Sequence, residues 1–317
     1  MEKNKLLVVY NTCGISGRDN TDYYIKAIRS ILSQDFKECR VVISSCMNPA
    51  PQREKLESEF GDTVSYCYID DLVPVNISFN KAVRDSIKEF GAFDGYLYLD
   101  SGLIFQKETD LTSLYDLYKS GPYAMASART TTDSGMLAWF NCVRCEEAFE
   151  SDMVIPVGKA LNLHAQIFSP ELFGAYGNLI PDIFASYCTE STFSFLCAAI
   201  KKKWIVSKDV VLEHAWSMDG ASSGFNPNGI IAQHMPAWQH LYGGPRSMVE
   251  IIEDPEGISS GFGYEEINDV MHHDPSQFDE DGYCKNTRLA EFIKKNIFMS
   301  SEYFDYDTMT STFINNE

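Results

Sequence analysis

Hydrophobic residues in the first two thirds of the chain form short continuous runs that alternate with longer stretches of helical spacing. Continuous runs predict buried strands, whereas a repeat such as Tyr24, Ile28 and Ile31 predicts a helix with one buried face. The expected strands are residues 5–10, 40–44, 64–69, 96–99, 103–105, 123–128, 139–145, 161–168 and 204–212. The expected helices are 23–32, 79–90, one that follows residue 111, and 191–203, with Asp22 or Thr21 placed to cap the first. This alternation predicts an α/β fold, with a mostly parallel sheet covered by helices on both faces.

The pattern changes after residue 216. A stretch rich in Gly, Ser, Asn and Pro occupies 222–228, and only short helical pieces follow, near 235–241 and 288–297. We therefore expect two parts, a domain formed by 1–216 and an irregular, partly helical C-terminal extension formed by 217–317. The extension could contribute to binding a second substrate or to contacts between copies in a homo-oligomer.

Composition places the chain among globular proteins of enzyme size. It has 317 residues, of which 44% are hydrophobic, and no run approaches the roughly eighteen apolar residues of a membrane span. Nine cysteines without regular spacing are typical of buried thiols in a reducing compartment, so we expect a cytoplasmic protein. Cys142 and Cys145 have the spacing of a zinc or redox pair, but no second pair or neighbouring His completes a tetrahedral set.

The net charge of -19 argues against nucleic acid as a partner, because most of the surface would repel a phosphate backbone. An anionic small ligand remains compatible with this charge where a cation or a local basic patch receives it. The sequence therefore directs attention to sites that could hold a cation.

Asp100 is the main candidate for such a site. It follows the apolar run 96–99 directly and precedes small residues and a second apolar run, 103–105. A carboxylate at the carboxyl end of a buried strand can hold Mg²⁺ or Mn²⁺ against a phosphorylated substrate. The alternative is an Asp that caps the following turn.

The order of these pieces resembles the GT-A glycosyltransferases, most closely their large inverting type, family 2. The resemblance covers about residues 5–216 and is carried by 6–12, 24–36, 41–45, 77–83, 99–102, 188–193, 203–206 and 212–216. It implies a Rossmann-like GT-A domain that binds a nucleotide-sugar donor and a saccharide or glycoconjugate acceptor. Asp100 falls where this family carries Asp-x-Asp, but Gly102 replaces the second Asp. Ser44 and Ser45 stand where the family tends to place an Asp for the nucleobase.

The resemblance also implies roles for individual residues. The general base would be Glu190 at a helix start, with Asp182 in reserve. A divalent cation, Mn²⁺ or Mg²⁺, would be bound by Asp100 and His214. The implied donor-binding residues are Asn11, Thr12, Ser44, Ser45, Lys81, Asp100 and Ser101, and the implied acceptor-binding residues are His164 and Trp216.

Each of these residues also has a structural interpretation. Glu190 could stabilise a helix dipole, and Asp182 could cap a turn after Pro181. His164 and His214 could be structural, and Trp216 could pack in the core. The basic run 201–203 is expected to close its helix rather than bind phosphate.

The resemblance thus implies transfer of a sugar from a nucleotide-sugar donor to a saccharide acceptor, and two other functions compete with this one. A sugar nucleotidyltransferase also uses a strand-end Asp and a cation, and the segment 14–18 is a sparse version of its Gly-rich phosphate loop. A non-catalytic glycan-binding or assembly protein would retain the fold with a degenerate Asp-x-Asp site. Binding of nucleotide diphosphates would separate these possibilities.

Overall fold

The computed structural model describes residues 5–13, 19–46, 48–70, 73, 75–130, 151–156, 161, 163–180 and 189–214, and the short pieces 276, 279–280, 285–287, 304–305 and 310–311. The strands are β1 (Leu6–Cys13), β2 (Cys39–Cys46), β3 (Ser65–Ile69), β4 (Gly95–Leu99), β5 (Leu103–Ile104), β6 (Tyr123–Thr130), β7 (Met153–Val154), β8 (Ala165–Phe168), β9 (Lys203–His214), β10 (Phe304–Asp305) and β11 (Thr310–Ser311). The helices are α1 (Thr21–Leu32), α2 (Ala50–Phe60), α3 (Val75–Phe90), α4 (Asp110–Lys119), α5 (Pro170–Tyr176) and α6 (Thr189–Ala199), with a 3-10 turn, η1, at Gly61–Thr63.

Nine of these strands form one sheet, in the order β3-β2-β1-β4-β8-β6-β9-β5, with β7 paired to β9. The strands β1, β2, β3, β4, β6 and β9 run in one direction, and β5, β7 and β8 run against them. The chain builds outward from β1 through β2 to β3 and then crosses to the other side of β1 to form β4. The strand order therefore reverses between β1 and β4, the kind of position at which open α/β sheets bind ligands.

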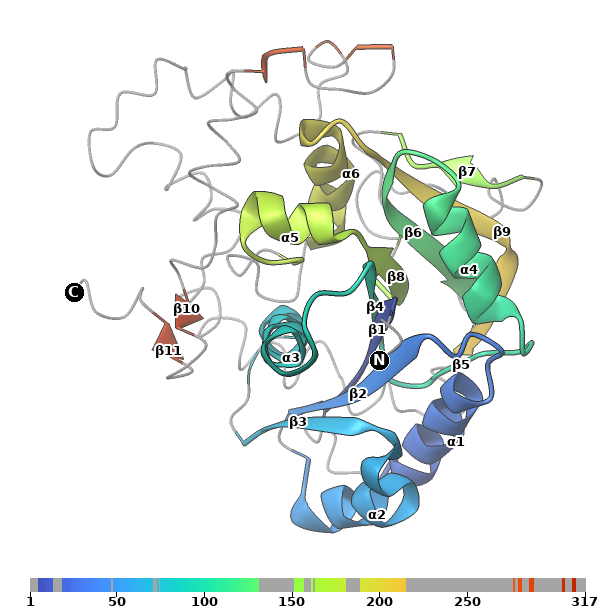
Figure 1. Cartoon of the computed structure of the whole chain (residues 1–317), viewed down its shortest axis with the longest axis vertical. Coiled ribbons are helices and arrows are strands. Elements are labelled where there is room, and N and C mark those ends of the chain that lie inside the picture. The colour runs from blue at the N-terminus through green and yellow to red at the C-terminus, as the bar shows by residue number, and fades with distance from the viewer. Residues whose placement is uncertain are drawn as a thin grey trace, which may run out of the picture.

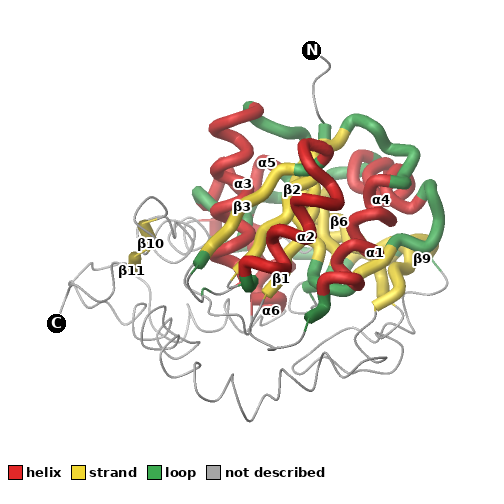
Figure 2. Tube along the Cα trace, turned by 90° about the horizontal axis from the view of Figure 1, so that it is seen from below, coloured by secondary structure: helices red, strands yellow, loops and turns green. Residues whose placement is uncertain are grey.

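Helices cover both faces of this sheet, because alternate residues of each central strand point to opposite sides. Leu7 and Val9 of β1 pack in one core with α3, α5 and α6. Leu6 and Val8 pack in a second core with α1, α2 and α4. Figure 1 shows α3, α5 and α6 on one side of the central strands and α1, α2 and α4 on the other. Figure 2 shows strands enclosed between helices from a second direction. The predicted α/β fold with a mostly parallel, two-sided sheet is confirmed.

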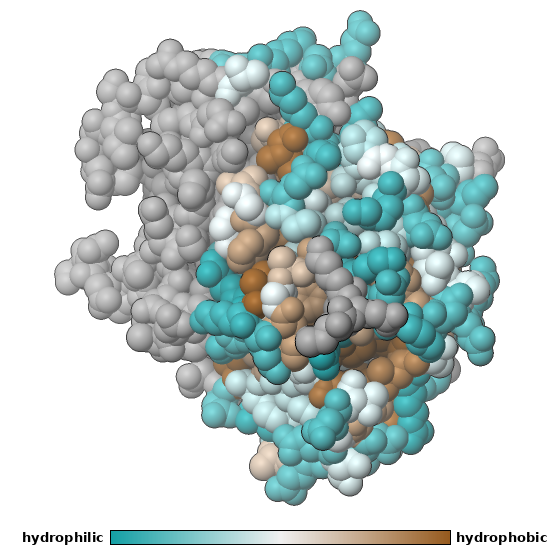
Figure 3. Space-filling view, viewed as in Figure 1, coloured by the Kyte–Doolittle hydropathy of each residue, from teal (hydrophilic) through white to brown (hydrophobic). Residues whose placement is uncertain are grey.

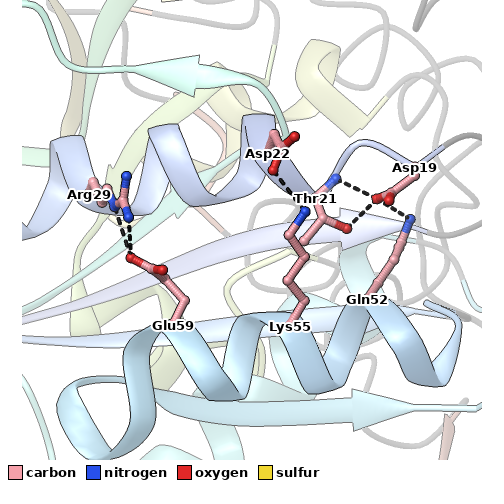
Figure 4. A network of polar contacts seen from close by, with 7 residues as sticks. All are labelled: Asp19, Thr21, Asp22, Arg29, Gln52, Lys55 and Glu59. Atoms are coloured by element: carbon pink, nitrogen blue, oxygen red, sulfur yellow. Dashed lines mark hydrogen bonds and ion pairs between the residues drawn. The ribbon is translucent and has the colours of Figure 1, made fainter.

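The start of α1 differs from the predicted cap. Thr21 is the first helical residue, and the preceding residue makes no side-chain cap hydrogen bond. Instead the carboxylate of Asp19 accepts a hydrogen bond from Thr21 N at 3.0 Å, a second from the Thr21 hydroxyl and a third from Gln52 Nε2 at 3.4 Å. Asp22 pairs with Lys55 Nζ at 2.8 Å (Figure 4). The cap prediction is wrong because the Thr21 hydroxyl donates to Asp19 and the Asp22 carboxylate pairs with Lys55 of α2.

The sequence prediction lacked the helices α2 and α5, the 3-10 turn η1 and the two-residue strands β7, β10 and β11. Helix α2 buries only Gln52, Leu56 and Phe60, so it has no continuous apolar stripe to detect. The expected strand at 139–145 and the helical pieces near 235–241 and 288–297 lie outside the described residues. The same holds for nearly all of the expected C-terminal extension, so the division at residue 216 stays a prediction.

The described surface is predominantly polar. On the face shown in Figure 3, hydrophilic side chains predominate and hydrophobic ones form smaller patches. Among the described large hydrophobic residues, Val154 is the exposed one. Within the part of the chain that the structure describes, no helix combines the length and the hydropathy needed to cross a bilayer. Cys39, Cys46, Cys67 and Cys197 are free thiols, and burial raises the pKa of Cys67 to about 12.

Candidate functional site

The carboxyl ends of β1, β2 and β4 meet where the strand order reverses. In parallel register, Asn11 lies beside Ser44 and Tyr10 lies beside Leu99. The buried Asn11 side chain crosses from β1 to β4, with Nδ2 donating to Leu99 O at 3.0 Å. On the other side, Thr12 Oγ1 donates to Ser44 O at 3.3 Å. The structure thus groups four of the predicted donor-binding residues, Asn11, Thr12, Ser44 and Ser45, along one edge of the sheet.

Asp100 follows β4 at this same edge, and the turn after it holds its carboxylate in place. Ser101 N donates to Asp100 Oδ1 at 2.9 Å. Gly102 has a φ of 82°, in the left-handed region that favours glycine. Gly102 N donates to the hydroxyl of Tyr10 at 3.0 Å, and burial raises the pKa of Tyr10 well above its ordinary value, so the phenol stays neutral. The turn therefore presents Asp100 while Gly102 contributes backbone only.

Two histidines reach Asp100 from other strands. Strand β8 runs antiparallel to β4, with Leu99 opposite Ala165, and Asp100 N donates to His164 O at 2.8 Å. Strand β9 pairs with β5, with Leu103 opposite His214. His164 Nδ1 lies 3.7 Å from Asp100 Oδ2, and the two imidazole centroids are 4.8 Å apart. Pairing between strands that are far apart in the sequence therefore brings three potential ligands, Asp100, His164 and His214, close together.

The separations among these three side chains suit a single divalent cation. One ligand atom from each of Asp100, His164 and His214 lies within 4.8 Å of the other two. Octahedral ligands at about 2–2.2 Å from an ion are about 3 Å apart when adjacent and just over 4 Å when opposite, so small side-chain adjustments would close the set. The Asp100 side chain is 36% exposed and the His164 side chain is 17% exposed, whereas His214 is buried. Such a set can hold an ion with one side open to a ligand.

Other predicted donor residues have local structural contacts. Ser44 Oγ donates to Ser78 O of α3 at 3.2 Å, and Ser45 is fully buried. Lys81 Nζ pairs with Asp85 of its own helix at 2.8 Å, and both charges act on the thiol of Cys67 in β3. Lys81 is therefore engaged in an ion pair within its own helix.

The predicted base lies at the start of α6. The backbone of Glu190 is in the first turn of that helix, but its side chain lies outside the described residues. Because α6 leads directly through a tight turn into β9, which runs parallel to β1, the helix begins toward the edge that carries Asp100. Asp182 and Trp216 also lie outside the described residues.

The sequence interpretation paired Asp100 with His214 and placed His164 with the acceptor. The structure brings His164 to the same cluster through the register of β8 on β4. This contact could not be predicted from a local sequence pattern, because the two paired strands are more than sixty residues apart and their pairing produces no such pattern. Tyr10 was interpreted only as a strand residue, yet its hydroxyl supports the turn that carries Asp100.

No family model and no curated protein sequence matches this chain. Among solved structures, the chain is similar to a mannosyltransferase, PcManGT, from Pyrobaculum calidifontis, described in complex with GDP-Man and Mn²⁺. That likeness has 12% identity and a TM-score of 0.49, and covers 95% of this chain and 87% of the other. TarS residues 1–349 from S. aureus gives 12% identity and a TM-score of 0.48, over 92% and 91% of the two chains.

At this identity and these TM-scores, neither likeness bears on the activity, donor or acceptor of this chain. The strand order, the strand directions and the helices on both faces describe the fold directly. This fold is α/β and Rossmann-like.

Proposed function

We propose that this chain is a glycosyltransferase that moves a sugar from a nucleotide-sugar donor to a hydroxyl group of a saccharide acceptor. The observation that carries the proposal is the position of Asp100. A carboxylate with two imidazoles stands at the carboxyl end of β4, beside the point where the strand order reverses. Open α/β sheets bind nucleotide ligands at such points.

The donor phosphates would lie against the cluster, and the rest of the nucleotide would lie along the carboxyl ends of β1 and β2. This edge offers buried polar side chains in a row, Asn11, Thr12, Ser44 and Ser45. Among the described residues, Asn11 Oδ1 and Ser45 Oγ have no hydrogen-bond partner. Buried polar atoms are normally paired, so these two atoms favour a polar ligand at this edge. Ser101 and Lys81 complete the proposed donor-binding set.

A cation belongs to this proposal because the chain is strongly acidic. The net charge of -19 opposes the approach of a diphosphate. A divalent cation bound by Asp100 and His214 would stabilise the negative charge of the departing nucleotide diphosphate. Carboxylate and imidazole ligands fit Mn²⁺ better than Mg²⁺.

Glu190 is the proposed general base. The acceptor oxygen forms a bond to the anomeric carbon as the bond from that carbon to the phosphate oxygen breaks, and Glu190 takes the proton of the attacking hydroxyl. Displacement in a single step inverts the anomeric centre. Asp182 remains the reserve for this role, and Trp216 is proposed to stack on the acceptor sugar.

The test replaces Glu190 by Gln and measures donor binding and turnover separately. Donors are a panel of nucleotide sugars with Mn²⁺, binding is followed by calorimetry, and transfer is measured to a panel of saccharides. We expect turnover to fall by about 100-fold or more while donor affinity stays within about twofold, because a base contributes to the transition state rather than to binding. Glu171→Gln is the matched control, since Glu171 also lies in the first turn of a helix, α5.

Unchanged turnover in Glu190→Gln would remove the assigned base. Failure of the unmodified chain to bind any nucleotide diphosphate would instead favour a non-catalytic glycan-binding protein. Formation of a nucleotide sugar from a nucleoside triphosphate and a sugar phosphate would indicate a nucleotidyltransferase.

A further inference from the structure

The turn that carries Asp100 offers one carboxylate where Asp-x-Asp would offer two. Position 102 is glycine, its φ of 82° is unfavourable for a residue with a side chain, and its N–H is engaged by Tyr10. This backbone conformation and the glycine are mutually consistent. A second ligand for a cation must therefore come from another element.

We propose that His164 replaces the second carboxylate, so that one Asp and two His residues, Asp100, His164 and His214, hold the cation. His164 would then act as a metal ligand in place of the acceptor-binding role that the sequence suggested. This inference rests on the proposed function and deepens it, since it assigns the ligands of the same cation and hence the ion that the site accepts.

The sheet fixes the relative positions of these ligands. Asp100 and His164 face each other across the antiparallel pair β4 and β8, and the Asp100 N–H donates to the His164 carbonyl at 2.8 Å. His214 is held by the pairing of β9 with β5, which lies just after the Asp100 turn. Three ligands held at or next to the ends of paired strands need little rearrangement to bind an ion, which favours specific binding over a loose surface contact.

The ligand types set the preference among ions. Mg²⁺ prefers oxygen ligands in near-ideal octahedral geometry, whereas imidazole suits transition ions. A site with two imidazoles and one carboxylate should therefore select Mn²⁺ over Mg²⁺, whereas a site with two carboxylates would discriminate less. His164 is the residue whose chemistry decides between these two outcomes.

The experiment measures binding of Mn²⁺ to the full chain by electron paramagnetic resonance, with Mg²⁺ as competitor and no sugar donor present. We expect the unmodified chain to bind Mn²⁺ at least about tenfold more tightly than Mg²⁺. His164→Ala should weaken Mn²⁺ binding by about tenfold or more, and His164→Asp should lower the ratio of Mn²⁺ to Mg²⁺ affinity by about tenfold. Glu213→Gln is the matched control, because Glu213 precedes His214 in β9 but pairs with Lys26 at 3.6 Å.

Equal Mn²⁺ affinity in His164→Ala and Glu213→Gln would overturn the proposal, as would an unchanged ion ratio in His164→Asp. The ratio is measured on the same sample, so partial unfolding of a variant does not imitate the expected change. If the ion preference follows His164 but no nucleotide sugar is used, the proposed function fails and this ligand set stands. If sugar is transferred but replacing His164 leaves ion binding unchanged, the proposed function stands and this ligand set fails.

Discussion

Single residues decide where the predicted helices begin and end. The sequence suggested a helix over 191–203, but α6 ends at Ala199. Lys201 adopts a left-handed φ of 56°, Lys201 N donates to Ala198 O and Lys202 N donates to Cys197 O, each at 2.9 Å. These bonds form a Schellman motif, which satisfies the last carbonyl groups of the helix. The backbone of Lys201 and Lys202 therefore closes the helix, while Lys202 Nζ pairs with Glu171 of α5 at 3.2 Å.

At the start of α1, Asp19 makes a pH-dependent contribution to stability. Hydrogen bonds from Thr21 hold the pKa of Asp19 below its ordinary value of 3.8. The stabilisation is fully present above about pH 4 and is lost as the pH falls through the lower folded-state pKa, because the protonated carboxyl accepts these bonds less well. We expect Asp19→Asn to lower the thermal midpoint of unfolding at pH 7, with a difference from the unmodified chain that shrinks toward pH 3.

Asp116→Asn controls for the loss of one negative charge from an exposed helical position. Thermal melts of both variants from pH 7 to pH 3 provide the comparison. A deficit in Asp19→Asn that is as large at pH 3 as at pH 7 would contradict the proposed role of the carboxylate.

Between elements, helix α3 holds the segment that leads toward the predicted base. Asn80 Nδ2 donates to Ile180 O at 2.6 Å, and Ile180 N donates back to Asn80 Oδ1 at 3.3 Å. One turn later, Arg84 donates to Asn178 Oδ1 and to Gly177 O. Both Asn80 and Ile180 are fully buried. The two hydrogen bonds of the Asn80 amide therefore satisfy the backbone N–H and C=O of Ile180 where the chain has left the sheet.

We predict that Asn80→Ala lowers the free energy of unfolding by about 2–3 kcal/mol, because it leaves the buried N–H and C=O of Ile180 without the amide that pairs them. Urea denaturation followed by circular dichroism measures the change. Glu89→Ala, at an exposed position of the same helix, should change stability by less than about 0.5 kcal/mol. A similar loss of unfolding free energy in both variants would mean that the substitutions affect α3 itself and not the hydrogen bonds between Asn80 and Ile180.

Across the whole molecule, aromatic rings join the elements on one face of the sheet. Phe79 of α3 lies 5.2 Å from Tyr98 of β4 and 5.8 Å from Phe168 of β8, measured between ring centroids. Phe168 in turn lies 5.4 Å from Phe193 of α6, which lies 5.9 Å from Trp204 of β9. This series connects the half of the sheet that carries Asp100 with the half that carries His214.

Phe168 occupies the middle of that series and is fully buried. We expect Phe168→Ala to lower the free energy of unfolding by about 3–5 kcal/mol, because it leaves a cavity between α3 and α6. Val154→Ala, at a side chain that is 40% exposed, should cost less than about 0.5 kcal/mol. Urea denaturation measures both, and equal effects would contradict a core centred on Phe168.

The hydrophobic pattern predicted most of the described strands and helices, because burial of a strand or of one helical face leaves a local repeat in the sequence. It placed Asp100 at the end of β4 and put Asn11 and Ser44 at strand ends. It missed α2 because that helix buries few side chains. Helix α2 supplies Gln52, which donates to Asp19, and Lys55, which pairs with Asp22 at the start of α1.

What the sequence determined by itself was therefore the identity of the elements and the residues at their ends. The tertiary structure alone decided that β8 runs antiparallel beside β4, that the strand order reverses beside Asp100, and that His164 and His214 meet there. The physical reason is that periodicity records whether a side chain is buried, whereas the choice of neighbouring strand depends on packing between segments far apart in the chain.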